Sequence, residues 1–296
     1  MKKIAFIGLG NMGGPIAHNI QEAGYELAVF DLDKEKAHEL LGNGATWASS
    51  VPMAVEDADI VFTSLPGPKQ LLALVAEGEA MPSYMKPDSV WVDLSTNNLD
   101  VARQMLLCCQ ANNVALLDAP VSGGTEGAAA GDLTIMIGGE ENVFETIRPV
   151  FEVIGEDIRF LGQHGAGYVA KIAQVVLCYL HSVALSEALM LGVKGGVQAG
   201  EMLNIIQNST GRSYVADRYG PAILDGSYDP GFALGLAEKD MNLTLELAQS
   251  VGATLPMCRQ VAEIYKSATE SYGFSQNHLM AVRLLEEANN MELRGS

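Results

Sequence analysis

Hydrophobic residues follow one pattern in the first part of the chain and another in the rest. Over about the first 160 residues, short apolar runs with little alternation are separated by segments of helical periodicity. Runs without alternation are typical of parallel strands that are covered on both faces. They occupy residues 4–8, 26–31, 60–65, 89–93, 115–118 and 134–138. Strands that alternate with helices predict a doubly wound α/β domain, of the kind called a Rossmann domain.

Beyond residue 161 the pattern is helical throughout. We expect one long helix over 165–194 and shorter ones over 199–207, 237–250, 257–271 and 276–289. Turn signals such as Asp229-Pro230-Gly231 and Val251-Gly252 separate them. The sequence therefore predicts an α/β domain over 1–161 and an all-helical domain over 162–293. Residues 294–296 are set aside as a candidate cloning remnant.

The long stretch 165–194 is expected to join the two domains. As a helix it would be about 45 Å long, at ~1.5 Å per residue. Apolar residues such as Val175, Val176 and Leu177 lie on several of its faces, so it should be buried in more than one place. This pattern suggests a dimer interface, although a single helical core also accounts for it.

The first apolar run leads into three regularly spaced glycines. Gly8-Leu9-Gly10-Asn11-Met12-Gly13 follows a strand and opens a helix, which is the context in which such glycines bind a dinucleotide. The first glycine permits a tight turn, the second lets the backbone approach the pyrophosphate, and the third lets the helix pack on the strand. The N–H groups at the start of the helix then face the phosphates. We therefore expect residues 8–13 to bind a dinucleotide cofactor.

An acidic residue follows at the spacing expected for this motif, roughly 20 residues further on. Asp31 ends the second apolar run, and Asp33 adds a second carboxylate. A carboxylate at this place binds the ribose hydroxyls and repels a 2′-phosphate, for which an arginine would be expected instead. The sequence therefore favours NAD over NADP.

Candidate cofactor contacts also lie at the ends of the next two strands, where open α/β sheets bind their ligands. Leu65 ends the third apolar run and Pro66 follows it, and Ser95 and Thr96 follow the fourth. Serine and threonine also cap helices at such places. We expect these four residues to contact the cofactor, whereas Ser64 suits either role equally.

A turn of small residues follows the fifth run. Ser122-Gly123-Gly124 exposes backbone N–H groups with no bulky side chain in the way, and small residues continue through Gly131. Such a turn suits a carboxylate group, to which the Ser122 hydroxyl adds a donor. The sequence thus favours a ligand site at 122–124 over a plain glycine-rich turn.

Lys171 lies near the start of the long helical stretch, after Gly162, Gly165 and Gly167. These glycines permit close approach of either a cofactor ring or a backbone. Its neighbours are largely apolar, and a charged lysine is costly to bury among them. A lysine that gives up its proton readily can act as general base in alcohol oxidation and as general acid in the reverse direction.

Two further sets of charged residues are candidates for binding. Lys239 could reach cofactor or substrate with Asp240 as its ion-pair partner, although a solvated pair on a helix is equally consistent with the sequence. Arg212 and Arg218 could clamp a carboxylate by their forked geometry. Solvated loop arginines are the more ordinary interpretation.

Composition narrows the function further. The net charge is −18, with 36 acidic and 18 basic residues, which argues against nucleic acid and anionic membranes as partners. Four cysteines and five histidines form no metal-ligand spacing, so no metal site is expected. With no signal peptide and no apolar run long enough for a membrane span, we expect a reduced, cytoplasmic protein.

Four motifs in order carry a resemblance to a known family. They are Gly8-x-Gly10-x-x-Gly13, Asp118-Ala-Pro-Val-Ser122-Gly-Gly124, Gly162-x-x-Gly165-x-Gly167-x-x-x-Lys171 and Lys239-Asp240. Together they resemble the β-hydroxyacid dehydrogenase family, which includes 3-hydroxyisobutyrate dehydrogenase, over nearly the whole chain. The resemblance implies hydride transfer between NAD(P) and a small 3-hydroxy acid. It also implies a helical domain like that of 6-phosphogluconate dehydrogenase and a homodimer or homotetramer.

The resemblance also implies roles for single residues. Lys171 would be the catalytic acid and base, and Ser122, Gly123 and Gly124 would bind the substrate carboxylate. Lys239 would lie near the nicotinamide and the substrate.

The chain departs from the family pattern at one position. The family has an asparagine four residues after the lysine, and here that position is Val175, preceded by Gln174. Gln174 could supply an amide from a neighbouring position of the helix, and Val175 could make room for an apolar substituent. Reduction of imines or non-acid carbonyls is therefore an alternative hypothesis, and a non-catalytic NAD-binding protein is a third.

Overall fold

The computed structural model describes residues 2–76, 78–229 and 231–295. The chain forms two compact units, Met1–Lys171 and Ile172–Ser296. The predicted domain boundary after residue 161 stays a prediction, because one helix, α8 (Ala166–Lys194), continues across the division between the units. Pro230 of the expected turn and Ser296 at the chain end lie outside the described residues.

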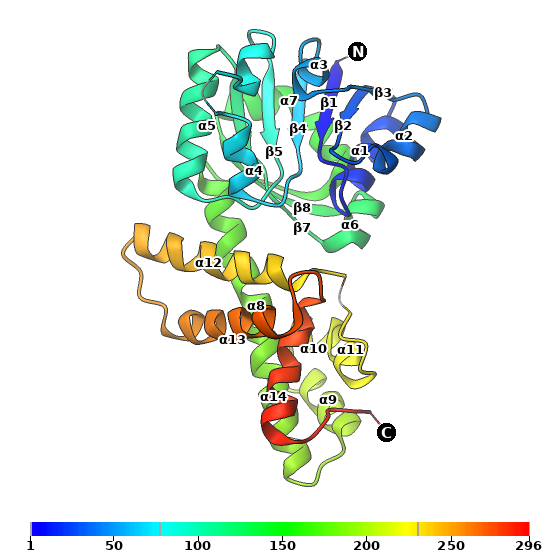
Figure 1. Ribbon diagram of the computed structural model, residues 1–296, viewed down its shortest axis with the longest axis vertical. Helices are drawn as coiled ribbons and strands as arrows, with labels where there is room; N and C mark the ends of the chain where they lie inside the picture. Colours follow the sequence, from blue (N-terminus) through cyan, green and yellow to red (C-terminus); the bar gives the residue numbers. More distant parts are fainter. Residues whose placement is uncertain (1, 77, 230, 296) are drawn as a thin grey trace. The chain divides into compact units, whose positions relative to one another are not determined.

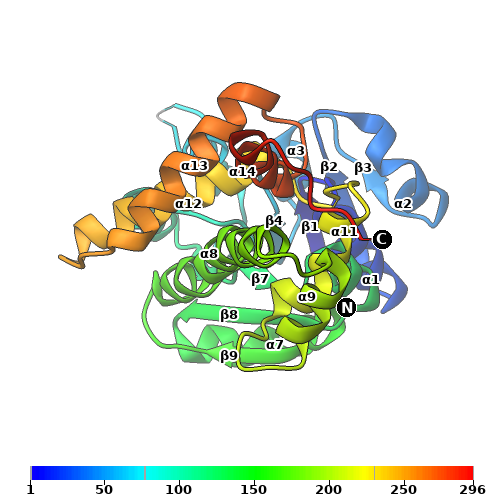
Figure 2. The ribbon, with the colours of Figure 1, turned by 90° about the horizontal axis from the view of Figure 1, so that it is seen from below.

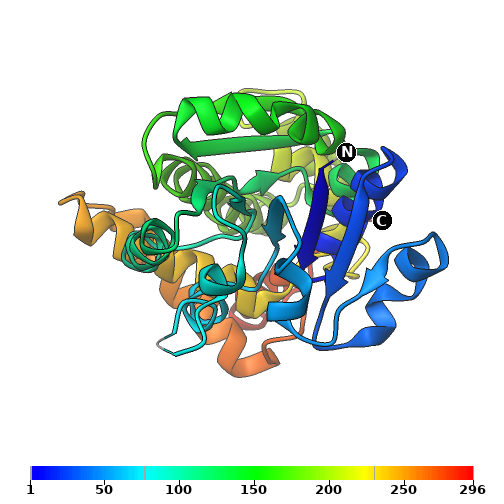
Figure 3. The same ribbon diagram turned by 90° about the horizontal axis from the view of Figure 1, so that it is seen from above.

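A mostly parallel sheet forms the centre of the first unit, with helices on both faces (Figures 1 and 3). Its strands lie in the order β3-β2-β1-β4-β5-β6-β8-β7, and β9 pairs with β8. They are β1 (Lys3–Ile7), β2 (Glu26–Phe30), β3 (Thr46–Trp47), β4 (Ile60–Thr63), β5 (Val90–Asp93), β6 (Ala115–Asp118), β7 (Val121–Ser122), β8 (Leu133–Gly139) and β9 (Gly155–Phe160). The pairs among β1 to β6 are parallel, whereas β8 runs antiparallel to β6 and β7. The predicted doubly wound α/β class is confirmed.

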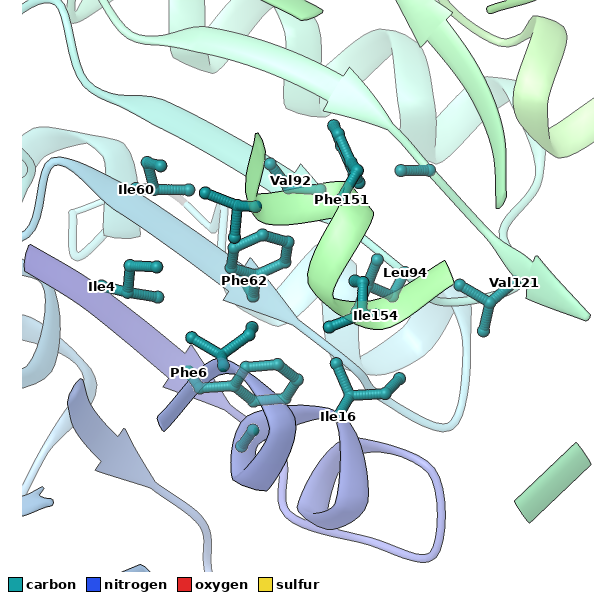
Figure 4. Packing of buried hydrophobic residues seen from close by; sticks show 14 of the residues in the cluster. Ile4, Phe6, Ile16, Ile60, Phe62, Val92, Leu94, Val121, Phe151 and Ile154 are labelled. Atoms are coloured by element: carbon teal, nitrogen blue, oxygen red, sulfur yellow. The ribbon is translucent and has the colours of Figure 1, made fainter. Parts of the chain in front are cut away.

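The helices of the first unit cover two separate apolar clusters. Along β1, Ile4 and Phe6 belong to one cluster, whereas Ala5 and Ile7 belong to the other. Figure 4 shows the first of these clusters, in which Phe6 packs near Phe62. Burial on both faces explains why the apolar runs lack alternation. The helical segments are α1 (Gly13–Glu22), η1 (Lys34–Ala37), α2 (His38–Gly42), α3 (Val51–Val55), α4 (Pro68–Ala73), η2 (Met81–Tyr84), α5 (Leu99–Ala111), α6 (Gly124–Ala130) and α7 (Glu141–Ile154).

The second unit is helical, as expected. Besides most of α8 it contains α9 (Ala199–Gln207), α10 (Tyr214–Arg218), α11 (Gly220–Leu224), α12 (Leu234–Ser250), α13 (Pro256–Tyr272), η3 (His278–Met280) and α14 (Ala281–Asn289). Helices α12 and α13 run side by side (Figures 1 and 2). Helix α8 contributes Leu185 and Leu189 to one apolar cluster and Val176 and Tyr179 to another. Leu177 and Leu191 of the same helix are exposed, so the dimer interface stays a prediction.

The chain end belongs to this second unit. The buried carboxylate of Glu286 accepts hydrogen bonds from the Leu293 backbone at 2.7 Å and from the Arg294 guanidinium at 3.0 Å. Arg294, which was set aside with the candidate remnant, therefore has a defined place in the helical unit.

Helix α8 corrects one expectation. By length and composition alone it could cross a membrane, although the sequence was expected to contain no apolar stretch of that length. The helix contains no unbroken apolar run of that length, because polar residues such as His181 and Ser182 interrupt it. Its mean hydropathy is nevertheless high enough for a membrane span. One such helix is weak evidence for a membrane span, because a core helix passes the same test.

Candidate active site

The three glycines of the first motif connect β1 to α1. Gly8 has a φ of +94°, and a Cβ there would lie 2.3 Å from the Ser64 carbonyl oxygen. A Cβ on Gly13 would lie 1.9 Å from the Gly8 carbonyl oxygen, so only glycine lets the helix start so close to the strand. A Cβ on Gly10 would meet no other described atom within 4 Å. The loop is therefore open at Gly10, where the motif requires a pyrophosphate to approach.

Asp31 holds this loop from the end of β2. Its carboxylate accepts hydrogen bonds from the backbone N–H of Leu9 at 2.7 Å and of Asp33 at 2.9 Å, and it pairs with Lys36 at 3.3 Å. Burial by itself would raise the pKa of Asp31, but these hydrogen bonds and the Lys36 charge together lower it below its usual range. Asp31 is thus ionised at neutral pH, beside the glycine loop.

Asp33 has a local structural role, and its expected contribution to the NAD preference stays a prediction. Its carboxylate accepts a hydrogen bond from the Glu35 backbone at 3.1 Å and caps the short helix η1. This local cap accounts for an acid at that position.

The ends of β4 and β5 meet at the same edge of the sheet because the two strands are parallel neighbours. Here Ser95 is buried, donates to Asp93 Oδ1 at 2.7 Å and accepts from the Leu65 backbone at 2.9 Å. The Ser95 hydroxyl therefore joins the two strand ends, and its expected contact with the cofactor stays a prediction. Pro66 is exposed and Thr96 is half-buried at this edge.

Lys171 and the small-residue turn lie together in the first unit. Lys171 Nζ donates to the Val121 carbonyl oxygen at 2.8 Å, one residue before the turn that begins at Ser122. Gly123 and Gly124 have φ values of +142° and +68°, which side chains rarely adopt. The amine of Lys171 is therefore held next to a turn whose backbone conformation glycine allows.

The glycines before Lys171 bring the start of α8 close to the sheet. The two carboxylate oxygens of Asp118, at the end of β6, accept from the backbone N–H groups of Gly165 and Gly167, each at 2.8 Å. A Cβ on Gly167 would lie 2.3 Å from the Met136 carbonyl oxygen. Of the two possibilities that the sequence left open, Gly167 thus permits close approach of a backbone.

Lys239 and Asp240 lie on α12 in the second unit and are not a solvated pair. Asp240 is buried, and its Oδ1 lies 3.0 Å from Lys239 Nζ. The hydroxyl of Tyr179 on α8 donates to Asp240 Oδ2 at 2.7 Å. Gln174 is exposed on α8, and Val175 is half-buried against the apolar cluster that contains Tyr179.

The remaining charged candidates are surface residues. Arg212 forms an exposed ion pair with Asp217, with 2.9 Å between Nε and Oδ2, and Arg218 is exposed. This placement favours the ordinary interpretation of both arginines. Among residues 2–76, 78–229 and 231–295, no group of three or more His, Cys, Asp or Glu side chains is arranged to hold a metal ion.

Two family models match the chain and together cover most of it. The NAD binding domain of 6-phosphogluconate dehydrogenase matches residues 3–162. The second, described as NAD-binding of NADP-dependent 3-hydroxyisobutyrate dehydrogenase, matches residues 165–285.

Curated relatives and solved structures extend over the same length. The NAD-dependent L-serine dehydrogenase of Pseudomonas aeruginosa is 36% identical over 96% of this chain and 98% of its own. The 2-(hydroxymethyl)glutarate dehydrogenase of Eubacterium barkeri is 36% identical over 99% and 98%. The structure of Mycobacterium tuberculosis 3-hydroxyisobutyrate dehydrogenase with L-serine has a TM-score of 0.86 at 30% identity, over 96% and 99%. An imine reductase of Streptomyces aurantiacus shares the fold alone, with a TM-score of 0.64 at 19% identity, over 96% and 99%.

Proposed function

Because the chain belongs to the β-hydroxyacid dehydrogenase family, we propose that Lys171 is the acid and base of its reaction. In that reaction hydride passes between NAD and the β-carbon of a small 3-hydroxy acid or its semialdehyde or keto partner. The observation that carries the proposal is the position of Lys171 Nζ, held by the Val121 carbonyl beside the turn 122–124. The family and the enzyme class are those that the four motifs predicted.

In the first unit, Lys171 transfers the proton and the turn 122–124 binds the substrate. In the oxidative direction the neutral amine of Lys171 takes the hydroxyl proton while hydride leaves the β-carbon, and in reduction the ammonium returns it. NAD, when bound, supplies the hydride acceptor. Ser122, Gly123 and Gly124 bind the substrate carboxylate, since successive N–H groups in such a turn form an anion-binding concavity.

The residues of the cofactor site fit NAD. The backbone is open at Gly10, and residues 8–13, Leu65, Pro66 and Thr96 line the loops that would hold the dinucleotide. The ionised Asp31 would accept the ribose hydroxyls and repel a 2′-phosphate. We therefore propose that NAD is preferred over NADP.

For residues of the second unit, the proposal rests on the family pattern alone. Lys239, held by Asp240, would contact cofactor and substrate. Val175 replaces the amide that the family pattern has at this position, and an apolar side chain there suits a substrate with an alkyl substituent. The panel of acids to be tested contains 3-hydroxyisobutyrate, L-serine and 2-(hydroxymethyl)glutarate, because the last two appear in the names of relatives of this chain.

The charge of the chain and its family support proposals about localisation, oligomeric state and partners. We propose a cytoplasmic homodimer or homotetramer that acts on small molecules, without nucleic acid or membrane partners. The net charge of −18 supports the exclusion of polyanionic partners. Light scattering, measured as the protein elutes from a size-exclusion column, gives its oligomeric state.

The test measures the formation of NADH from NAD, and of NADPH from NADP in parallel, with each acid of the panel as substrate. Lys171→Ala should lower kcat by about 10³-fold while NADH binding stays unchanged, because general acid–base groups contribute roughly 10²- to 10⁴-fold. Lys194→Ala is the matched control, since Lys194 lies on the same helix and its Nζ also donates to a backbone carbonyl, that of Asn289. An active Lys171→Ala enzyme would show that Lys171 is not the acid and base.

Inactivity on every acid leads to the second candidate. Val175 favours reduction of cyclic imines or non-acid carbonyls as that candidate, and these compounds are tested next with NADH. NADH binding without turnover on either panel would support a non-catalytic protein.

A further inference from the structure

A carboxylate without contact to solvent lies at the end of β5. Asp93 is 0% exposed and accepts hydrogen bonds from the hydroxyls of Thr63, Ser95 and Tyr168, each at 2.7 Å. Burial raises the pKa of Asp93, and the three hydroxyls oppose that rise. The first two donors come from the sheet edge, but Tyr168 comes from the first turn of α8. Asp93 therefore joins the sheet to that helix.

A second buried carboxylate lies directly beside it. Asp118 is paired with Asp93 in the register of β5 and β6, and it binds the backbone N–H groups of Gly165 and Gly167. Two neighbouring strand ends thus hold the start of α8 at three points. Two of these points are main-chain groups, and the third is the Tyr168 hydroxyl.

Lys171 follows Tyr168 by three positions on the helix, so the two side chains lie on neighbouring parts of its surface. The amine of Lys171 reaches the Val121 carbonyl from this turn. Any rotation or shift of the first turn of α8 would change the position of that amine relative to the turn 122–124. A displacement of about 1 Å in a reacting group can cost on the order of 10²-fold in rate.

Stability alone is a weak reason for this arrangement. Removing a carboxylate from water is costly, and buried polar clusters are often no more stabilising than apolar packing of the same volume. A neutral Ser or Asn caps a helix N-terminus at much lower desolvation cost. The use of two buried carboxylates for the start of one helix is explained if its placement matters to the chemistry.

We propose that Tyr168 is a positioning residue, whose hydroxyl, held by Asp93, fixes the first turn of α8 and thereby the amine of Lys171. The proposal rests on the proposed function, in which Lys171 moves the proton. It assigns no contact with substrate or cofactor to Tyr168 or to Asp93.

The test is Tyr168→Phe, which removes a single oxygen atom. We expect kcat to fall about tenfold, with the KM for NAD unchanged and with a shift in the pH at which kcat/KM reaches half its maximum. Tyr265→Phe is the control, because Tyr265 is equally buried and its hydroxyl lies in the helical unit, 3.3 Å from His278 Nδ1. It should lower the melting temperature without changing kcat or the pH profile.

Asp118→Asn tests the same anchor from the neighbouring strand, in case Tyr168→Phe does not fold. Its amide can accept from only one of the two glycine N–H groups, so the same loss of kcat and the same pH shift are expected. A folded Tyr168→Phe or Asp118→Asn enzyme with wild-type kcat and pH profile would overturn the proposal. If Lys171→Ala is inactive in that case, the proposed function still stands, whereas an active Lys171→Ala enzyme would contradict the function itself.

Discussion

The two units differ in what their tightly packed glycines face: main-chain atoms in the first unit and side chains in the second. In the first unit, the glycines that approach a neighbour most closely face main-chain atoms: Gly13 faces the Gly8 carbonyl, and Gly167 faces that of Met136. In the helical unit, the space beside Gly192 is filled by the Met202 side chain. A side chain can turn away, but a backbone in a sheet cannot. The geometry of the first unit is therefore set by the main chain, and that of the second by side-chain packing.

The buried polar groups differ in the same way. Asp93 and Asp118 each have several donors, some of them backbone N–H groups. In the helical unit the buried His278 lies among aromatic rings, including Tyr179 and Tyr219, and its Nδ1 lies 3.3 Å from the Tyr265 hydroxyl. Motifs built on main-chain contacts recur at fixed spacing, which makes them easier to recognise in a sequence.

The largest expected effect compares two glycines of the same helix. Gly167→Ala brings a Cβ to 2.3 Å from a carbonyl oxygen of the sheet, and we expect a loss of about 3 kcal/mol in unfolding free energy. Gly192→Ala meets only the flexible Met202 side chain, and alanine favours a helix by ~1 kcal/mol, so the change should be near zero. Urea unfolding of both variants measures the difference. Equal losses would contradict the contrast between the units.

A smaller effect concerns His278 in the helical unit. Burial lowers the pKa of His278 to about 3, against 6.5 in the unfolded chain. Between pH 6.5 and pH 3 the unfolded state binds a proton at His278 and the folded state does not. The free energy of unfolding is therefore unaffected by His278 above pH 6.5 and decreases progressively as the pH falls toward 3. The slope is about 1.4 kcal/mol per pH unit.

Urea unfolding at pH 7 and pH 5 measures this loss, expected to be about 2 kcal/mol from His278. His278→Phe should remove that share of the pH dependence, whereas His18→Gln, at a half-exposed site, should keep it. The same slope in wild type and His278→Phe would show that another group is responsible.

The smallest effect concerns a side chain that supports a main-chain motif. Asp31→Asn removes the charge that should repel a 2′-phosphate, and we expect the preference for NAD over NADP in kcat/KM to fall about tenfold. Asp33→Asn should change the preference less, because Asp33 caps η1. Steady-state kinetics with both cofactors compare the variants. An unchanged preference in Asp31→Asn would place cofactor selection elsewhere.

Much of the first unit could be predicted because its signals are local. The run 115–118 coincides with β6, and the run 4–8 contains most of β1. Strand β9 was missed because charged residues such as Glu156, Asp157 and Arg159 interrupt its apolar positions. The helices α10 and α11 are each five residues long, too short to show a period.

The candidate site also contains residues that local motifs predicted and residues that they did not. Lys171 and the turn 122–124 belong to recognisable motifs, and both lie in the first unit. The contact between Tyr168 and Asp93 joins residues 75 positions apart. It depends on how the strands and α8 come together, for which the sequence offers no local signal. The same holds for the Ser95 hydroxyl, whose partners lie on two strand ends.

The indole of Trp91 gives the Asp93 cluster an optical reporter. Trp91 is fully buried and donates from Nε1 to the Thr63 hydroxyl at 2.9 Å, and that hydroxyl in turn donates to Asp93. The chain has two tryptophans, and the other, Trp47, is half-buried on β3. Replacing Trp47 by phenylalanine would leave one fluorophore, one hydroxyl away from the carboxylate that anchors α8. The emission of this protein can then follow that anchor directly, with no label attached.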